Sequence, residues 1–454
     1  MARGVGCEVP SATVLLALVL AAAIDGEAAR AHAARLSSLG PHPFGSPRAR
    51  IAAEYVAEQF RQAGLDEVRI EGFESQGTRG GNVLGVLRAP GREFVVVSAH
   101  HDTAPDSAGT YEAGAVGVLI EAARTLSRRS PRPRTLVFAS WDGAEAGPAP
   151  AAGSAAYVRS LGSETRQLVA ALAVGRCGAA GARPVLHSIA YPDPMRSGAS
   201  VIAPAWLMRA ALAGAAGEGE PIGVGDPLLS WIYQPAVRCF RVRVHGDDLS
   251  FLQARLPAAC VSDRAFTTSR PERERLDTPD RLDGRTLERM GRAVVGIVAT
   301  WQVTPRGPDS EPTWFSAFGH VLGPGMVFAA GAVFLALGLA GGLRRGGLVL
   351  AARVVQAGCF ATLLWRHPVP ATWVFALPCV VALAAPRRWS TILALTPTLA
   401  LLAWGGAGWW RGVASGLWPR PWELVLTGMA LGLLWVRPPA RGAGRQKGIK
   451  GARR

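Results

Sequence analysis

The run VVVSAHHDTA, residues 95–104, decides the fold class of this chain. Apolar and small residues lead into His100, His101 and Asp102, which is typical of a buried strand that ends in a polar loop. The run TLVFASWDGAEAG, residues 135–147, has the same form and ends in an acidic, glycine-containing loop. Ligands of open α/β sheets bind beyond the carboxyl ends of the strands, so these two loops are predicted to carry the functional site.

Strands and helices alternate on both sides of these two runs. This order predicts an α/β domain with a central mixed, largely parallel sheet that is flanked by helices. The predicted strands are 66–73, 82–88, 93–99, 135–141, 168–174, 239–244 and 258–262, and the predicted helices are 26–38, 48–64, 112–127, 151–161, 205–215 and 282–302.

Charged residues become sparse towards the C-terminal third of the chain, and apolar runs lengthen there. About five such runs predict an all-α transmembrane bundle after the α/β domain. The positive-inside rule then places the α/β domain outside the cytoplasm, on the periplasmic or luminal side, and the basic tail inside. The predicted segments are a signal peptide or membrane anchor (1–25), the α/β domain (26–303), a linker (304–320), the transmembrane helices (321–436) and the cytoplasmic tail (437–454).

The chain carries a formal net charge of +16. Its basic residues lie along soluble helices, between apolar runs and in the tail, and no nucleic-acid recognition motif accompanies them. The sequence therefore predicts contact with anionic membrane lipid and no nucleic-acid partner. The six cysteines form no CxxC pair, so they neither indicate a zinc site nor require disulfides.

Several motifs occur in the order in which a known family has them. They are GSPRARIAAEYVAEQF (45–60), SAHHD, GVLIEAARTL, LVFASWDG-x-EAG, GSAAYV (153–158), FLQARLPAACVSD and DTPDRLD. Together they resemble the di-zinc aminopeptidase family, which includes bacterial leucyl aminopeptidases and glutamate carboxypeptidase-like enzymes. The resemblance covers about residues 26–303 and implies a zinc-aminopeptidase-like fold.

The resemblance also implies roles for residues near the strand ends. His100 matches a metal ligand, and Asp102 matches the aspartate that orients the histidine from behind the metal. Glu145 matches a second metal ligand. The position before it, where the family has its general base, holds Ala144.

The three remaining ligand positions of the family hold other residue types. Tyr111 stands where the bridging aspartate is expected, Leu172 where a further carboxylate is expected, and Arg273 where the last histidine is expected. Catalytic zinc normally needs three protein ligands, and an alanine at position 144 cannot take a proton from water. The sequence therefore predicts a remnant metal site that holds no cofactor.

Two further hypotheses concern the remaining charges. Glu145 and Arg273 are predicted to pair across the former metal site. Glu112 is considered as a substitute ligand, but a side chain one position further along a helix is expected to point elsewhere. His100 and Asp102 then remain as a structural pair.

These observations favour a membrane-anchored pseudopeptidase that binds a peptide or a partner protein. The alternative is an active zinc-dependent exopeptidase that uses non-standard ligands. A third interpretation makes the membrane bundle the functional part and the α/β domain its regulator.

Overall fold

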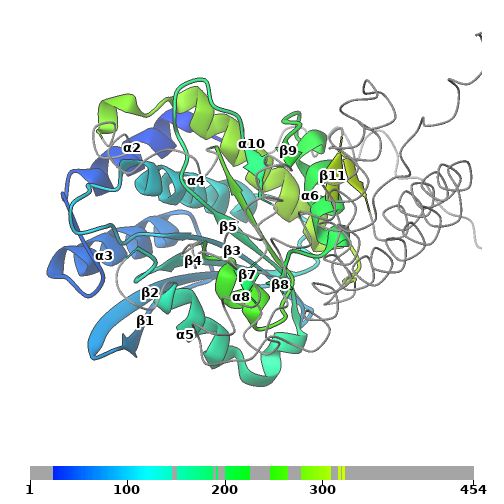
Figure 1. Ribbon diagram of the computed structural model, residues 1–454, viewed down its shortest axis with the longest axis horizontal. Coiled ribbons are helices and arrows are strands. Elements are labelled where there is room, and N and C mark those ends of the chain that lie inside the picture. The colour runs from blue at the N-terminus through cyan, green and yellow to red at the C-terminus, as the bar shows by residue number, and fades with distance from the viewer. Residues whose placement is uncertain are drawn as a thin grey trace, which may run out of the picture. The chain divides into compact units, whose positions relative to one another are not determined.

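A computed structural model of the chain describes the residues of one α/β domain and a few neighbouring strands. The central element is a mixed eight-stranded sheet with the strand order β1-β2-β4-β3-β5-β10-β6-β9 (Figure 1). The described residues are 24–145, 151–187, 191–192, 200–224, 246–263, 278–307, 315–317 and 320–322.

The middle of the sheet is parallel and its flanks are mixed. Strand β3 pairs in parallel with β4 and β5, and β5 pairs in parallel with β10. The strands are β1 (Glu67–Ser75), β2 (Thr78–Leu87), β3 (Phe94–His100), β4 (Thr135–Trp141), β5 (Leu168–Val174), β6 (Val185–Leu186), β9 (Gly223–Val224) and β10 (Ala258–Ser262). Two smaller sheets pair β7 (Tyr191–Pro192) with β8 (Ser200–Val201) and β11 (Phe315–Ala317) with β12 (His320–Leu322).

Helices cover both faces of the sheet (Figure 1). The first layer consists of α2, α3, α4, α6 and α10, and the second consists of α5 and α8. Their bounds are α2 (Gly26–Ser37), α3 (Pro47–Gln62), α4 (Thr110–Ser127), α5 (Ala152–Leu161), α6 (Ala205–Gly217), α8 (Leu249–Gln253) and α10 (Gly284–Val303), with short 3-10 helices at Gly162–Arg166 and Pro279–Arg281.

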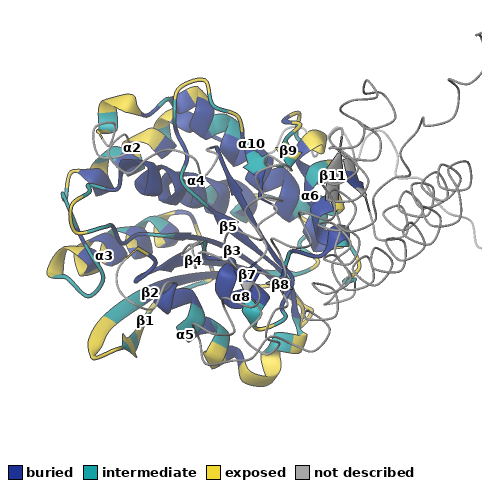
Figure 2. Cartoon of the chain, in the orientation of Figure 1, coloured by how far each residue is buried: buried dark blue, intermediate teal, exposed yellow. Residues whose placement is uncertain are grey.

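Burial follows this layering (Figure 2). Every residue of β5 and β10 is buried, whereas the edge strand β1 has only intermediate and exposed residues. On the α5 and α8 side, Trp141 packs against Tyr157 and Phe251 with ring centroids 5.2 and 6.4 Å away. This aromatic cluster anchors the end of β4, from which the acidic loop continues.

The α/β part of the fold prediction is confirmed. Strands β4, β5 and β10 have the predicted bounds, and α4 begins two residues before the predicted 112. Strands β6 to β9 were missed, because two-residue strands are too short to show a period. The predicted strand 239–244 lies outside the described residues.

The transmembrane part of the fold prediction was wrong. Within the part of the chain that the structure describes, no helix is both long and apolar enough to cross a membrane. Val321 and Leu322, where the first span was predicted to start, belong to strand β12. The physical reason is that an apolar run is compatible with a strand as well as with a helix. The rest of the predicted bundle and the tail, 323–454, lie outside the described residues.

Candidate functional site

The register of the central strands brings three loops to one edge of the sheet. His100 at the end of β3 is the pairing partner of Trp141 at the end of β4. Ser98 in β3 pairs with Ala173 in β5, so Arg176 follows at the same edge. The polar residues predicted from the two quoted runs therefore lie together, as expected for the carboxyl ends of parallel strands.

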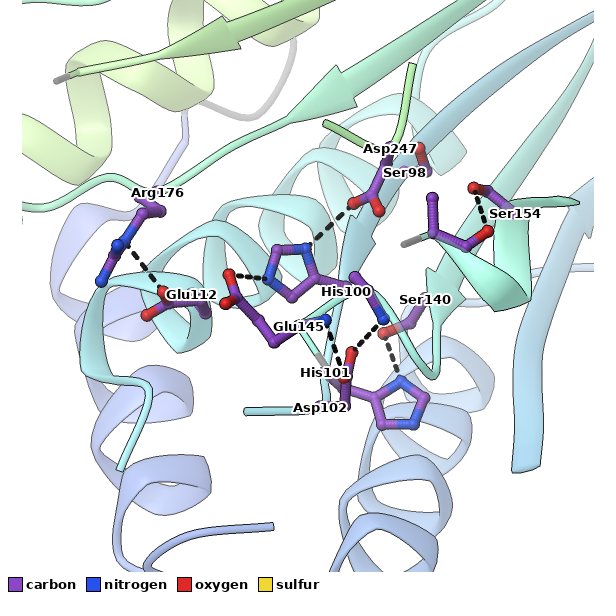
Figure 3. A network of polar contacts seen from close by, with 12 residues as sticks. Ser98, His100, His101, Asp102, Glu112, Ser140, Glu145, Ser154, Arg176 and Asp247 are labelled. Carbon is purple, nitrogen blue, oxygen red and sulfur yellow. Dashed lines mark hydrogen bonds and ion pairs between the residues drawn. The ribbon is translucent and has the colours of Figure 1, made fainter. Parts of the chain in front are cut away.

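His100 lies between two carboxylates (Figure 3). Its Nδ1 donates a hydrogen bond to Oδ2 of Asp247 at 3.0 Å, and its Nε2 lies 3.6 Å from Oε1 of Glu145. Burial alone would lower the pKa of His100, but the Asp247 and Glu145 carboxylates outweigh it and hold that pKa well above its usual value. Because an ionised carboxylate only accepts, Asp247 fixes the proton on Nδ1 and directs Nε2 towards Glu145.

Glu112 lies in the first turn of α4 and is buried. Its Oε1 is 2.8 Å from Nε of Arg176, and its Oε2 is buried without a hydrogen-bond partner. Burial raises the pKa of Glu112, while Arg176 acts in the opposite direction. The expectation that this side chain points away was wrong: its carboxylate lies beside His100 and Glu145. A glutamate side chain reaches further than an aspartate, and the positive N-terminus of a helix favours an acid in this turn.

Asp102 accepts two hydrogen bonds from the loop that follows β4. Its Oδ1 accepts the backbone N–H of Ala144 at 2.9 Å, and its Oδ2 accepts that of Glu145 at 3.0 Å. Burial raises the pKa of Asp102 to about 7. Asp102 thus fixes the loop that carries Glu145, and the hydrogen bond that orients His100 comes from Asp247.

Two of the positions predicted as lost ligands are buried. Leu172 is fully buried inside β5, opposite Val97 of β3. Tyr111 is buried in the first turn of α4. Arg273 lies outside the described residues, so its predicted pairing with Glu145 stays a prediction.

His101 points away from this group and into the protein (Figure 3). Its Nδ1 is hydrogen-bonded to Oγ of Ser140 at 3.0 Å. Burial, together with His42 and His100, lowers the pKa of His101 to about 3, so it is neutral at physiological pH.

The donor set fits one metal ion. One ligand atom from each of His100, Glu112 and Glu145 lies within 4.8 Å of the others. Nε2 of His100 faces Oε1 of Glu145 at 3.6 Å, and Oε2 of Glu112 is buried without a hydrogen-bond partner. A metal ion can take both atoms as ligands once the imidazole has lost its Nε2 proton. Among the described residues, Leu172 offers no donor for a second ion, and Arg176 already lies against Glu112.

Sequence reasoning missed the contribution of Asp247 and Arg176, and it expected Glu112 to point elsewhere. Asp247 is 147 positions from His100 in the chain, and Arg176 follows a strand with no motif of its own. Only the tertiary arrangement brings them to the site: Asp247 precedes α8, and Arg176 follows β5.

The fold and this arrangement define a peptidase-like α/β domain. Residues 82–298 match the model of Peptidase family M28. This match agrees with the resemblance to di-zinc aminopeptidases that the motifs carry.

Solved structures with a similar chain include a glutaminyl cyclase from Porphyromonas gingivalis, with 17% identity and a TM-score of 0.47 over 61% of this chain and 98% of that chain. BSAP, a zinc aminopeptidase from Bacillus subtilis, shows 14% identity and a TM-score of 0.47 over 61% of this chain and 95% of that chain. A leucine aminopeptidase precursor from Bacteroides thetaiotaomicron shows 17% identity and a TM-score of 0.47 over 61% and 98%. The comparison with curated proteins found no match.

Proposed function

We propose that the M28 domain binds the amino-terminal part of a peptide, free or within a partner protein, without hydrolysing it. The observation that carries this proposal is Ala144. The resemblance places the general base of the family at this position, and a methyl group there cannot take a proton from water.

The neighbouring carboxylates do not replace that base, because each is already engaged. Asp102 accepts two backbone N–H groups, Asp247 accepts the Nδ1 proton of His100, and Glu112 faces Arg176. Glu145 lies beside the imidazole of His100. These contacts support a site that can bind a ligand and in which no described carboxylate is left to activate water.

The place and chemistry of the site support ligand binding. It lies at the carboxyl ends of the central parallel strands, where α/β sheets bind their ligands. Glu145 is the most accessible carboxylate of the group, with 32% of its side chain exposed. A carboxylate in this position favours the ammonium group of a peptide's amino terminus.

A metal ion in this site would act as a Lewis acid on a carbonyl oxygen of the bound peptide. His100, Glu112 and Glu145 are the residues that would hold it. Asp247 orients the imidazole and Asp102 holds the Glu145 loop, so both act on the ligands rather than on the peptide.

The test uses the purified full chain and fluorescein-labelled peptides with different amino-terminal residues. We expect a saturable rise in fluorescence anisotropy, weakened at least about fivefold by Glu145→Gln and unchanged by Glu74→Gln on the exposed strand β1. Incubation with leucine p-nitroanilide and zinc should release no more p-nitroaniline than the Glu145→Gln variant does. Absence of binding by every peptide would refute the proposal.

The second candidate function is a zinc-dependent exopeptidase. The observation that favours it is the group of His100, Glu112 and Glu145, which supplies the three protein ligands of a catalytic zinc site. Release of p-nitroaniline that depends on zinc and is lost in Glu145→Gln would establish this function and exclude the first.

A further inference from the structure

We propose that the free edge of strand β1 is a self-association surface, on which a second copy of this chain adds its own β1 antiparallel about a two-fold axis at Ile70. The eight-stranded sheets of the two copies then continue into one another. This inference concerns a different part of the molecule from the candidate functional site, and it does not depend on peptide binding.

Strand β1 has an open edge among the described residues. It is the first strand in the order of the eight-stranded sheet, where β2 is its neighbour (Figure 1). The edge of a sheet presents backbone N–H and C=O groups that can pair with another strand. Natural proteins often blunt such an edge with a short strand, a proline or a lysine, but β1 has nine residues and contains neither proline nor lysine.

The hairpin between β1 and β2 determines which backbone groups face outward. Gln76 and Gly77 have φ angles of 50° and 78° and form its two-residue turn. Such a turn is flanked by a hydrogen-bonded residue pair, here Ser75 and Thr78. Bonding to the neighbouring strand alternates along an antiparallel ladder, so Ile70 turns its N–H and C=O away from β2. Ile70 can therefore exchange both bonds with Ile70 of a second copy.

Ile70 is also the apolar centre of this edge. Its side chain is 43% exposed, and among the described residues only Ile51 and Val303 are other large hydrophobic residues of the exposed class. Pairing about Ile70 sets the two Ile70 side chains opposite each other, so that each covers the other. Val68 of one copy then lies opposite Gly72 of the other, on the same face of the sheet.

The charged residues of β1 select this register. Pairing about Ile70 sets Arg69 of each copy opposite Glu71 of the other. An axis at Arg69 would instead oppose two arginines, and an axis at Glu71 would oppose two glutamates, which is destabilising. Within one chain, Arg69 already lies 2.7 Å from both Glu67 and Glu71, so the alternating charges are ordered before pairing.

The acids towards the ends of the strand are balanced within each chain. Glu67 forms an ion pair with Arg88, and Glu74 lies 3.8 Å from Arg79. These acids therefore do not prevent the approach of a second copy. Because one strand of each copy forms the contact, the interface is small and the dimer is expected to be weak.

The first test measures the mass of the full chain against its concentration by analytical ultracentrifugation. We expect a reversible monomer–dimer equilibrium at concentrations up to about 100 μM. Arg69→Glu should weaken the dimer at least about tenfold, because it sets like charges opposite each other at two places. Combining Arg69→Glu with Glu71→Arg restores opposite charges across the axis and should recover the dimer.

The second test examines the register by cross-linking. The Cα atoms of a hydrogen-bonded antiparallel pair lie about 5.5 Å apart, which a disulfide can span. Ile70→Cys should therefore form a disulfide-linked dimer under mild oxidation. Glu74→Cys is the matched control, because this position lies on the same face of β1 but on the order of 25 Å from its own copy.

Circular dichroism checks that each variant folds, and cross-linking decides if Arg69→Glu does not. Hydrogen exchange in β1 should slow as the protein concentration rises, whereas exchange in β5 should not change. A chain that stays monomeric, a dimer that Arg69→Glu leaves unchanged, or equal cross-linking through Ile70→Cys and Glu74→Cys would each overturn the proposal.

Discussion

Asp102 illustrates how one buried side chain shapes the site. Its two carboxylate oxygens accept the backbone N–H groups of Ala144 and Glu145. The side chain is therefore a structural clamp on the loop after β4, and it determines where Glu145 lies.

Replacing Asp102 should cost stability as well as site geometry. Asp102→Ala leaves two N–H groups without acceptors, so we expect the free energy of unfolding to fall by about 2–4 kcal/mol. Asp102→Asn keeps one acceptor oxygen and should cost less. Urea denaturation followed by circular dichroism measures both, and an equal loss in the two variants would contradict the clamp.

His187 makes stability depend on pH. It is buried beside β10, where its Nε2 is hydrogen-bonded to Oγ of Ser262 at 2.6 Å. Burial lowers the pKa of His187 to about 4. Between that value and the ordinary pKa of histidine, the unfolded chain holds a proton that the folded chain does not. Stability contributed by neutral His187 is therefore present near neutral pH and is lost as the pH falls.

A comparison with His187→Gln isolates this effect from other titrating groups. Between about pH 7 and about pH 4.5, the unmodified chain should lose roughly 2 kcal/mol of unfolding free energy relative to the variant. Urea titrations at the two pH values measure the difference. A difference that stays constant with pH would show that His187 titrates normally in the folded chain.

At the scale of elements, the position of α4 determines which residues of its first turn face the site. Helix α4 packs closely against α2, because Gly117 lies where an added Cβ atom would be 2.2 Å from the carbonyl oxygen of Ala29. The absence of a side chain at this position allows the two helices to approach. Because Glu112 lies in the first turn of α4, this helix packing also positions its side chain beside His100.

Gly117→Ala tests this packing. Alanine favours helix formation, yet the contact with the Ala29 backbone would force the helices apart, so we expect a loss of about 1–3 kcal/mol. Gly217→Ala at the end of α6, where nothing lies within 4 Å, is the control and should leave stability unchanged or slightly higher. Thermal unfolding of both variants gives the answer, and equal melting temperatures would contradict the close-packing argument.

At the scale of the whole molecule, stability should be graded across the sheet. Strand β5 is buried throughout and pairs with β3 and β10, whereas β1 pairs with β2 at the sheet edge and is partly exposed. Local opening of an exposed edge costs less than opening of the centre.

Hydrogen exchange followed by mass spectrometry checks this gradient. Peptides from β5 should exchange only through global unfolding, and peptides from β1 should exchange much faster. Equal protection of the two strands would contradict this gradient.

The sequence by itself determined the α/β class, the bounds of β4, β5 and β10, and the loops that carry His100, Asp102 and Glu145. These features follow from local patterns of apolar residues, which a single sequence displays directly. Through the resemblance, the sequence also showed that Ala144 stands at the position of the family's general base. The same patterns failed at β12, because an apolar run does not distinguish a strand from a helix.

Only the tertiary structure decided which charges meet. Asp247 is hydrogen-bonded to His100, which lies 147 positions away in the sequence. Arg176 lies beside Glu112 because β5 ends, and α4 begins, at the same edge of the sheet. Such contacts depend on strand order and helix packing, which leave no local trace in the sequence. For this reason the motifs identified His100 and Glu145, but only the structure placed Glu112 beside them.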